Sequence, residues 1–498
     1  MVQGVETHSH LPGLVVLIPI IFTALVGIFQ KRSFLLRNWL FISGAAITFA
    51  GMALMGYYVL QGRILVINYL VAMFPFTITF RVDTLSFLIG VVAAGVWLLA
   101  SIYCLQYMKD DHAPNRYFPV HIFTLAGSLG VFLAGNLYTF FLFYEVMAFS
   151  GYLFVIHAET PEAFKAGSRY LMVTILSGIL VFTGVIITYQ LAGTLDLGSL
   201  GIIPEANVVS LIAFVAFIIG FGFKAGLFPL HTWLPAAHPV APSPASALLS
   251  GILIKTGAYG IIRVTYNVYG IEMMRDTGWP TILLIFAAIT TLYGSMAALV
   301  QDNLKRRLAY SSISQIGYIL MGGALLTERG LAGDVFHIVS HATIKSTLFL
   351  TAGAIITKTG IKYVSQMAGV GRKMPYTMGA FTLAALAMIG IPPLNGFVSK
   401  WALALGALDA GQPGYAVVLL ISSMLNALYY LPIVILAYFR KPEEGTVLYG
   451  DMLRYDEARA SMLVPILILA LSLVIFNILP VNLPLVLAEF SARALFQH

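Results

Sequence analysis

Five ionisable side chains stand inside stretches of sequence that are otherwise apolar. They are one acid and four lysines: Glu145, Lys224, Lys255, Lys345 and Lys400. A charge at the centre of a bilayer costs on the order of 3 kcal/mol, so such residues usually serve a function. Burial disfavours a charged amine and a neighbouring carboxylate favours it. A buried Glu beside a buried Lys can therefore change the protonation of that Lys, which is chemistry suited to proton transfer.

Histidines extend this set of candidate proton-transfer residues. His337, His341 and Lys345 are spaced i, i+4 and i+8, so all three lie on one helical face, about 6 Å apart per step. Because like charges disfavour one another, the three cannot all be protonated, and we expect a proton wire. His231 and His238 follow Lys224 in a Pro-rich segment and are candidates for an auxiliary relay, since histidine titrates near neutral pH.

Each candidate also has a structural alternative. A structural ion pair, for which Lys224 is the natural partner, or a protonated carboxyl group would account for Glu145. Snorkelling to the interface would account for Lys224, and an interfacial anchor for Lys400. A polar seam between helices would account for the residues at 337–345, and structural packing for the two histidines near Lys224. Lys255 lies about four turns into its apolar stretch, too deep to snorkel easily, and we expect it to relay protons.

Several other chemistries are excluded by the sequence. The single cysteine, Cys104, cannot supply the several thiolates that an iron–sulfur cluster or a Cys-ligated zinc site needs. Ile338 stands where an H-E-x-x-H zinc motif has its Glu, and no P-loop, G-x-G-x-x-G turn or G-x-S-x-G elbow is present. We therefore expect no metal, no cofactor and no redox centre in this chain. Energy for pumping would come from another subunit.

The composition is that of a protein embedded in lipid. Of 498 residues, 59% are apolar and 10% are charged, whereas a soluble domain is about half apolar and a quarter charged. This excludes a soluble globular enzyme and predicts an all-α polytopic membrane protein. Apolar stretches long enough to cross a bilayer predict about fourteen transmembrane helices, at residues 12–30, 38–60, 84–107, 117–134, 137–157, 171–191, 208–229, 243–266, 279–300, 308–326, 333–356, 378–396, 415–438 and 462–482.

The loop charges predict an orientation. Eighteen Lys and Arg residues fall in one set of alternate loops, and six fall in the other. The smaller set is Arg63, Arg81, Arg263, Arg275, Arg329 and Arg493. Cytoplasmic loops carry the excess of positive charge, so the larger set should face the cytoplasm of a cell (inner) membrane, with both termini outside. The net charge of +7 therefore reflects membrane orientation and does not indicate nucleic-acid binding.

Two helices are predicted to be broken. Lys224 lies late in one of them, next to Gly226 and Pro229, and Lys400 lies just past the other. The second break contains Gly390, Pro392, Pro393 and Gly396. A membrane tolerates such interruptions only where protein or water satisfies the freed backbone groups. Interrupted helices in matching positions of two halves are the best sequence indication of a transport site.

The positions of the breaks predict an internal repeat. Residues 117–266 would hold helices 4–8 and residues 267–440 would hold helices 9–13. Since each unit has an odd number of helices, the second enters the membrane from the opposite side and the two copies are inverted. Residues 1–116 would form three N-terminal helices, and residues 441–498 an amphipathic loop and the last helix.

Seven segments together resemble a known family. They are Val82–Ser86, Phe143–Glu145, Lys224–Pro235, Ala237–Gly251, Asp302–Arg306, Ser311–Tyr318 and Gly390–Leu394. The chain resembles the antiporter-like membrane subunits of respiratory complex I, membrane-bound hydrogenases and Mrp-type cation/proton antiporters. The resemblance covers about residues 80–400.

The resemblance implies a fourteen-helix core with inverted repeats and assigns roles to the candidate residues. Glu145 would modulate Lys224 in an input half-channel, and Lys255 would link the two halves through water. The residues His337, His341 and Lys345 would continue the central polar axis. Lys400, where some family members carry Glu, would exchange protons with the outside.

The resemblance and the buried charges lead to a functional hypothesis. We expect a proton-translocating subunit of a redox-driven membrane complex, either a complex I-like NADH/quinone oxidoreductase or a membrane-bound hydrogenase. The alternative is an Mrp-type subunit that exchanges Na⁺ for H⁺ without redox coupling. A stand-alone solute transporter is disfavoured, because it would need a substrate-sized polar pocket. The expected partners are other antiporter-like and small membrane subunits, a redox module and the lipid bilayer.

Overall fold

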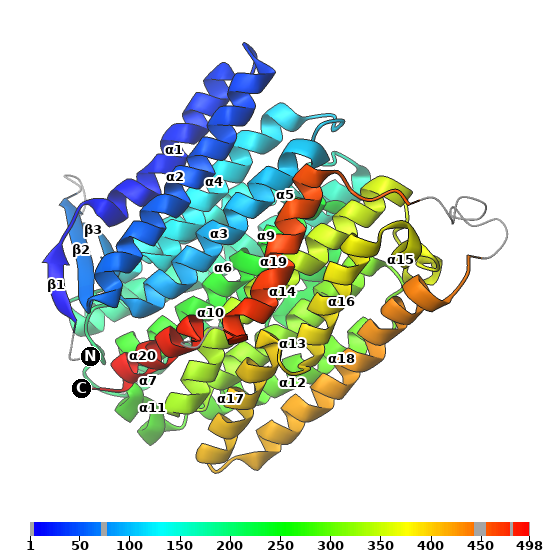
Figure 1. The fold of residues 1–498 in the computed structure, drawn as a ribbon. Coiled ribbons are helices and arrows are strands. Elements are labelled where there is room, and N and C mark those ends of the chain that lie inside the picture. Colours follow the sequence, from blue (N-terminus) through cyan, green and yellow to red (C-terminus); the bar gives the residue numbers. More distant parts are fainter. Residues whose placement is uncertain (1–3, 71–76, 443–454, 479–481, 498) are drawn as a thin grey trace.

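The structure is a computed structural model that describes residues 4–70, 77–442, 455–478 and 482–497. Long helices run back and forth between two ends of the molecule (Figure 1). The N-terminal helices are α1 (Leu11–Phe29), α2 (Phe34–Leu60) and α3 (Thr84–Tyr107). Those that follow up to the middle of the chain are α4 (Pro114–Phe132), α5 (Leu137–Val155), α6 (Pro161–Ala192), α7 (Val208–Ala225), α8 (Leu234–Val240), α9 (Ser243–Leu248) and α10 (Ile254–Arg263).

The second half of the chain continues the bundle. Its helices are α11 (Ile271–Thr277), α12 (Pro280–Leu299), α13 (Leu304–Ala324), α14 (Glu328–Thr359), α15 (Val370–Lys373), α16 (Pro375–Ile389), α17 (Asn395–Asp409), α18 (Pro413–Phe439), α19 (Ala460–Ile478) and α20 (Leu483–Phe496). α14, which is buried from Gly330 to Ile355, packs against helices from both halves of the chain, including α3, α13, α17 and α20. It is the centre of the fold.

The helical membrane fold is confirmed. Each of the fourteen predicted stretches overlaps a helix, and eleven spans among the described residues are long and apolar enough to cross a membrane by length and composition. The stretch predicted at 378–396 is α16 with the start of α17, so this span is divided. Residues 479–481 of the last predicted span, and residues 443–454 of the predicted amphipathic loop, lie outside the described residues.

A small sheet lies beside the N-terminal helices (Figure 1). Its strands β1 (Val5–His8), β2 (Arg63–Leu70) and β3 (Thr77–Val82) follow this order across the sheet. β1 and β2 are parallel, β2 and β3 are antiparallel, and Leu65 pairs with Val82. The sequence did not predict these strands, because short alternating patterns next to long apolar helices give a weak signal.

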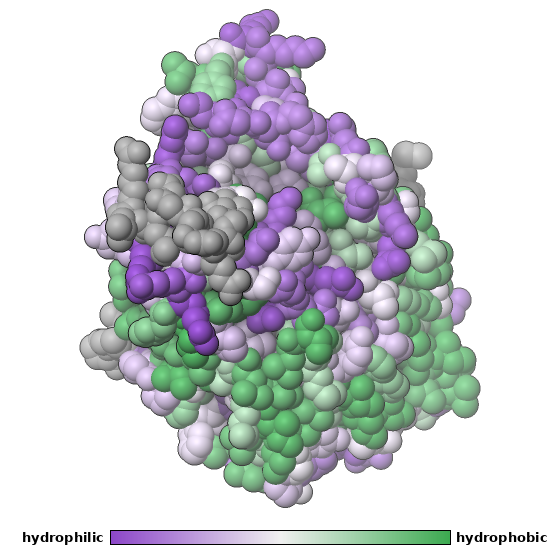
Figure 2. Space-filling model, turned by 90° about the vertical axis from the view of Figure 1, so that its right-hand side faces the viewer, coloured by the Kyte–Doolittle hydropathy of each residue, from purple (hydrophilic) through white to green (hydrophobic). Residues whose placement is uncertain are grey.

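The polar loops gather at the end of the bundle opposite the two termini. The N- and C-terminal ends of the chain lie close together (Figure 1). Because α1 and α3 run away from that end, the loops with Lys31 and Lys109 lie at the opposite one. Figure 2 shows hydrophilic surface gathered at that end and hydrophobic surface on the adjoining flank. A multi-pass membrane protein has this distribution, with lipid against the apolar flank.

Arg263 was predicted in an outer loop, but it is buried near the end of α10. Its Nη2 donates to both carboxylate oxygens of Asp83, at 2.9 and 2.7 Å, and its Nε donates to the Tyr259 hydroxyl. Asp83 caps α3 by accepting from the Ser86 N–H. Burial alone would raise the pKa of Asp83, but the Arg263 guanidinium and the Ser86 N–H hold this pKa below its usual value. The pair fixes α3 to α10.

Replacing Asp83 with Leu is expected to destabilise the protein by about 3 kcal/mol, because the Arg263 charge stays buried without a partner. The double variant Asp83→Leu/Arg263→Met removes both charges and should recover most of this loss. The measurement is the Tm of the purified protein in detergent. A single variant as stable as the unmodified protein would contradict a fixing role for the ion pair.

Candidate functional site

Both predicted helix breaks are present. α7 ends at Ala225, and Gly226 adopts a φ of 85°. α16 ends at Ile389, and Gly390 adopts a φ of 95°. Left-handed backbone of this kind favours glycine and ends a helix. After the first break the chain continues through a 3₁₀ turn capped by Pro229 into α8, and after the second it passes Pro392 and Pro393 into α17.

Gly396 allows the two parts of the second broken helix to approach closely. A Cβ atom at this position would overlap the carbonyl oxygen of Ala387 in α16. Because the obstacle is backbone, no side-chain rotation relieves it. The glycine therefore sets the angle at which α17 leaves α16.

Gly396→Ala is expected to destabilise the protein by about 1–3 kcal/mol through this overlap. Gly379→Ala is the matched control, since Gly379 also lies on this broken helix but has no neighbouring atom within 4 Å of its Cβ position. The measurement is the Tm and the yield of folded protein for the two variants. Equal stability of the two would show that the close approach is unimportant.

Lys224 is the penultimate residue of α7, two positions before Gly226, and is buried. Its Nζ donates to the Tyr170 hydroxyl at 2.7 Å and lies 4.9 Å from the centre of that ring. The Tyr170 hydroxyl in turn donates to the carbonyl of Ala148 on α5. Lys224 is thus held inside the protein and does not snorkel to the interface.

Glu145 lies on α5 and points toward α6. Its carboxylate occupies the space beside Gly178, where a Cβ atom would collide with it. It is partly exposed, but its Oε1 is buried and has no hydrogen-bond partner among the described residues. In this part of the chain it forms no direct ion pair with Lys224, although the two charges interact electrostatically. Tyr170 of α6, which accepts a hydrogen bond from Lys224, also interacts electrostatically with Glu145.

Lys255 follows a turn of π-helix, Leu249–Leu253, which lies between α9 and α10. Its Nζ donates to the carbonyl of Ser250, five residues earlier. The same turn contacts α13 through Ser250 and Ser312, whose hydroxyl oxygens are 2.7 Å apart. Interruptions of this kind are frequent at functional sites because they free backbone groups for other partners. Lys255 is buried and interacts electrostatically with Lys345.

His337, His341 and Lys345 lie on one buried face of α14, as their spacing predicted. The two imidazole rings are stacked with centroids 6.0 Å apart. His337 is bonded at both nitrogens, to Ser399 at 2.9 Å and to Gln315 at 3.1 Å. Neither nitrogen of His341 has a protein partner among the described residues.

Lys345 joins three helices. Its Nζ donates to the carbonyl of Leu308 and the hydroxyl of Ser311 on α13, and to the hydroxyl of Tyr430 on α18 at 3.2 Å. All these partners are uncharged oxygen acceptors. The amine can therefore give up a proton without leaving a counter-charge behind.

Lys400 lies on α17 and is buried, which excludes a role as an exposed interfacial anchor. Its Nζ turns back to the end of α16 and donates to the carbonyls of Met388 and Ile389, at 2.6 and 3.3 Å. These carbonyls are among those that a helix end leaves without intrahelical partners. Lys400 thus stabilises the second break.

Tyr318 connects Lys400 to the histidines. Its ring centroid is 5.0 Å from the Lys400 Nζ and 5.5 Å from the centroid of His337. The structure therefore places Lys345, His341, His337, Tyr318 and Lys400 in one buried row. The sequence singled out Tyr318 only within a longer motif, because its role depends on contacts between α13, α14 and α17.

The two auxiliary histidines lie apart from this row. His231 is packed between the rings of Phe228 and Tyr293, and its buried Nδ1 has no partner among the described residues. His238 is stacked on Phe349 and likewise has two unpartnered nitrogens within the described chain. His238 interacts electrostatically with Lys345, which places it nearer the central row than His231.

Asp334 is a buried ionisable residue that the sequence did not single out. It lies on α14, one turn before His337, beside Gly322 and Gly323. Both its carboxylate oxygens are buried without a partner in the described part of the chain. The i, i+3, i+7 spacing of Asp334, His337 and His341 is the signal that would have found it.

Comparison with known proteins identifies the family. A family model described as "NADH:quinone oxidoreductase/Mrp antiporter, TM" matches residues 134–426, which is more than half of the chain. The chain belongs to this family. A second model, "NADH-Ubiquinone oxidoreductase (complex I), chain 5 N-terminus", matches residues 69–118. The resemblance inferred from the sequence motifs is confirmed.

Relatives of both branches of the family are similar over nearly the whole chain. An NADH-quinone oxidoreductase subunit of Desulforudis audaxviator is 32% identical, with 94% of this chain and 96% of that protein covered. An Na⁺/H⁺ antiporter subunit of Alkalihalophilus pseudofirmus is 31% identical, with 98% and 96% covered. A chain of the archaeal membrane-bound sulfane sulfur reductase has the same fold, with a TM-score of 0.88, 24% identity and 98% of each chain covered.

Proposed function

We propose that this subunit carries protons across the membrane along its buried row of ionisable residues, as part of a redox-driven complex with other membrane subunits. One observation carries the proposal: His341, His337, Tyr318 and Lys400 follow one another through ring contacts inside the protein, and Lys345 interacts electrostatically with His341. Groups that exchange protons at neutral pH and that cannot all be charged together suit stepwise proton transfer.

The remaining charged residues receive roles in the same scheme. Glu145 alters the proton affinity of Lys224 through α6, and Lys255 passes protons from the first half to Lys345 and His341. Lys400, at the second break, exchanges protons with the outer side. The electrostatic interactions of Glu145 with Lys224, and of Lys255 with Lys345, support this order.

We further propose a cell (inner) membrane location with both termini outside. The excess of Lys and Arg in the loops at the opposite end of the bundle supports this orientation. A terminal tag tests it, because a protease added to intact cells should remove the tag only if that terminus lies outside.

The alternative is an Mrp-type subunit that exchanges Na⁺ for H⁺ without redox chemistry. The similarity to an Na⁺/H⁺ antiporter subunit, nearly equal to that with an NADH-quinone oxidoreductase subunit, favours keeping this second candidate. The proteins that co-purify with the chain distinguish the two, since a quinone or hydrogenase module supports the first and only small Mrp-like subunits the second.

The decisive experiment measures both ions in proteoliposomes of the purified complex. A pH-sensitive dye inside the vesicles reports protons, and ²²Na⁺ reports sodium. We expect proton movement that starts with the electron donor and needs no Na⁺. Proton movement driven by a sodium gradient alone, with matching ²²Na⁺ flux, would replace the redox-driven proposal by the Mrp alternative. Movement of neither ion would contradict both.

A further inference from the structure

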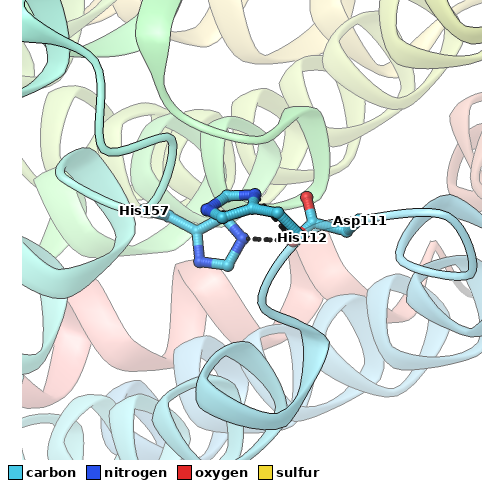
Figure 3. A group of neighbouring side chains, drawn as sticks. All are labelled: Asp111, His112 and His157. Carbon is cyan, nitrogen blue, oxygen red and sulfur yellow. Dashed lines mark hydrogen bonds and ion pairs between the residues drawn. The ribbon is translucent and has the colours of Figure 1, made fainter.

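Three metal-ligating side chains meet at the end of the bundle that carries the basic loops (Figure 3). Asp111 and His112 lie in the loop between α3 and α4, and His157 lies just after α5. His157 Nε2 is 2.9 Å from Asp111 Oδ1, and His112 Nδ1 is 3.3 Å from the same oxygen. One donor atom from each residue lies within 4.8 Å of the other two.

The donor set is the one that zinc prefers. Two imidazole nitrogens and one carboxylate oxygen are common ligands of a tetrahedral Zn²⁺ site, at about 2.0–2.2 Å from the metal. Glu159 Oε2 lies 3.7 Å from His112 Nε2, but Glu159 Oε1 is paired with Arg116, so the site offers three protein donors and leaves a fourth position for water. The His112 side chain is about half exposed and can turn toward an ion.

His157 and Asp111 are held in place by burial and by hydrogen bonds to the backbone. The His157 side chain is 2% exposed, and its carbonyl accepts a hydrogen bond of 2.7 Å from Arg116 Nη2. Asp111 also accepts from the N–H of Ala113, which fixes the loop before α4. A purely structural contact would need only the bond between His157 and Asp111. The ring centroid of the exposed His112 lies 5.1 Å from that of His157. This second imidazole is not needed for the hydrogen bond between His157 and Asp111.

The cluster also borders a cavity. This cavity, of about 310 Å³, is lined by the three residues and, on its other side, by Ala241 and Lys305. Lys305 is buried and donates to the carbonyl of Ala241, in the segment that joins α8 to α9. His238, which interacts electrostatically with Lys305, lies one turn earlier. An ion held by the cluster would therefore share a cavity with Lys305, which interacts electrostatically with His238.

We propose that Asp111, His112 and His157 bind a divalent transition-metal ion of the Zn²⁺ class, and that the bound ion inhibits proton movement by obstructing this cavity. The inhibition rests on the proposed function, whereas the binding does not. The sequence predicted no metal site, because His157 is 46 positions from Asp111 and no short motif joins them.

Metal binding is tested on the complete purified complex by titration with ZnCl₂, followed by calorimetry, and with Co²⁺, followed by its visible absorption. His112→Gln alters an exposed side chain and His157→Gln keeps a group of similar polarity at the buried one. We expect each variant to lose one Zn²⁺ per complex or to bind it at least tenfold more weakly. His10→Gln, at the opposite end of the molecule, is the control and should bind as the unmodified complex does. Identical titrations of all four proteins would overturn the site.

Inhibition is tested by adding Zn²⁺ to proteoliposomes during proton translocation. We expect inhibition of the unmodified complex and resistance of His112→Gln at the same concentration. Translocation that continues with the site shown to be filled would overturn the inhibition and leave the binding site in place. Absence of translocation before any Zn²⁺ is added would count against the proposed function, and the calorimetric result would still decide the metal site.

Discussion

Lys224→Ala is expected to abolish proton translocation while the complex still assembles. Among the described residues its side chain is the only charged group at the first helix break, and its amine is held by an uncharged hydroxyl on Tyr170. Alanine removes the proton carrier and leaves Glu145 without the charge that it senses across α6. A general acid or base of this kind contributes about 100-fold or more to a rate. The measurement is dye-detected proton uptake in proteoliposomes, normalised to assembled complex.

Two companion variants make this result interpretable. Lys165→Ala removes an exposed lysine from the first turns of α6, near Tyr170 in sequence, and should leave translocation unchanged. Tyr170→Phe keeps the Lys224 charge but removes its hydrogen-bond acceptor, and should give an intermediate rate. Normal pumping by a correctly assembled Lys224→Ala complex would refute the role of Lys224.

Lys345→Met is expected to reduce proton translocation to below about one tenth, the second largest effect. Methionine has a similar length and an adaptable shape, so the packing among α13, α14 and α18 is largely kept. What is lost is the amine that links Ser311 and Tyr430 to the histidines on α14. Without Lys345, protons that arrive from Lys255 can enter the row only at His341, so we expect slow translocation.

The control for this variant is Tyr430→Phe. It removes one acceptor of Lys345 but leaves the bonds to Leu308 and Ser311, so we expect most of the activity to remain. Both variants are compared by the yield of assembled complex before any rate is interpreted. If Lys345→Met pumps as fast as Tyr430→Phe, protons do not pass through Lys345.

The alternative for the residues at 337–345 is that they are polar residues that only pack helices together. A seam would be satisfied by hydrogen bonds, and His337 does have both of its nitrogens bonded. His341 has neither nitrogen bonded within the described residues, although it is fully buried. A buried unpartnered imidazole is costly for packing alone.

The sequence by itself determined the fold class, the transmembrane helices and the helical face on which His337, His341 and Lys345 lie. Hydropathy and the 3.6-residue period are local properties, so they can be read without knowing which helices meet. The two helix breaks could also be predicted, since Gly226 and Gly390 act on their own backbone. The mid-span lysines could be singled out because charge in lipid is costly wherever the helix packs.

Only the tertiary structure decided which side chains meet. The link from His337 through Tyr318 to Lys400 depends on three helices, and the interaction of Glu145 with Lys224 depends on the packing of α5 against its neighbours. The ion pair of Arg263 with Asp83 and the contact of Asp111 with His157 likewise depend on how separate helices pack. Such contacts join residues far apart in the chain, and their geometry is set by how the helices pack, which no local pattern records.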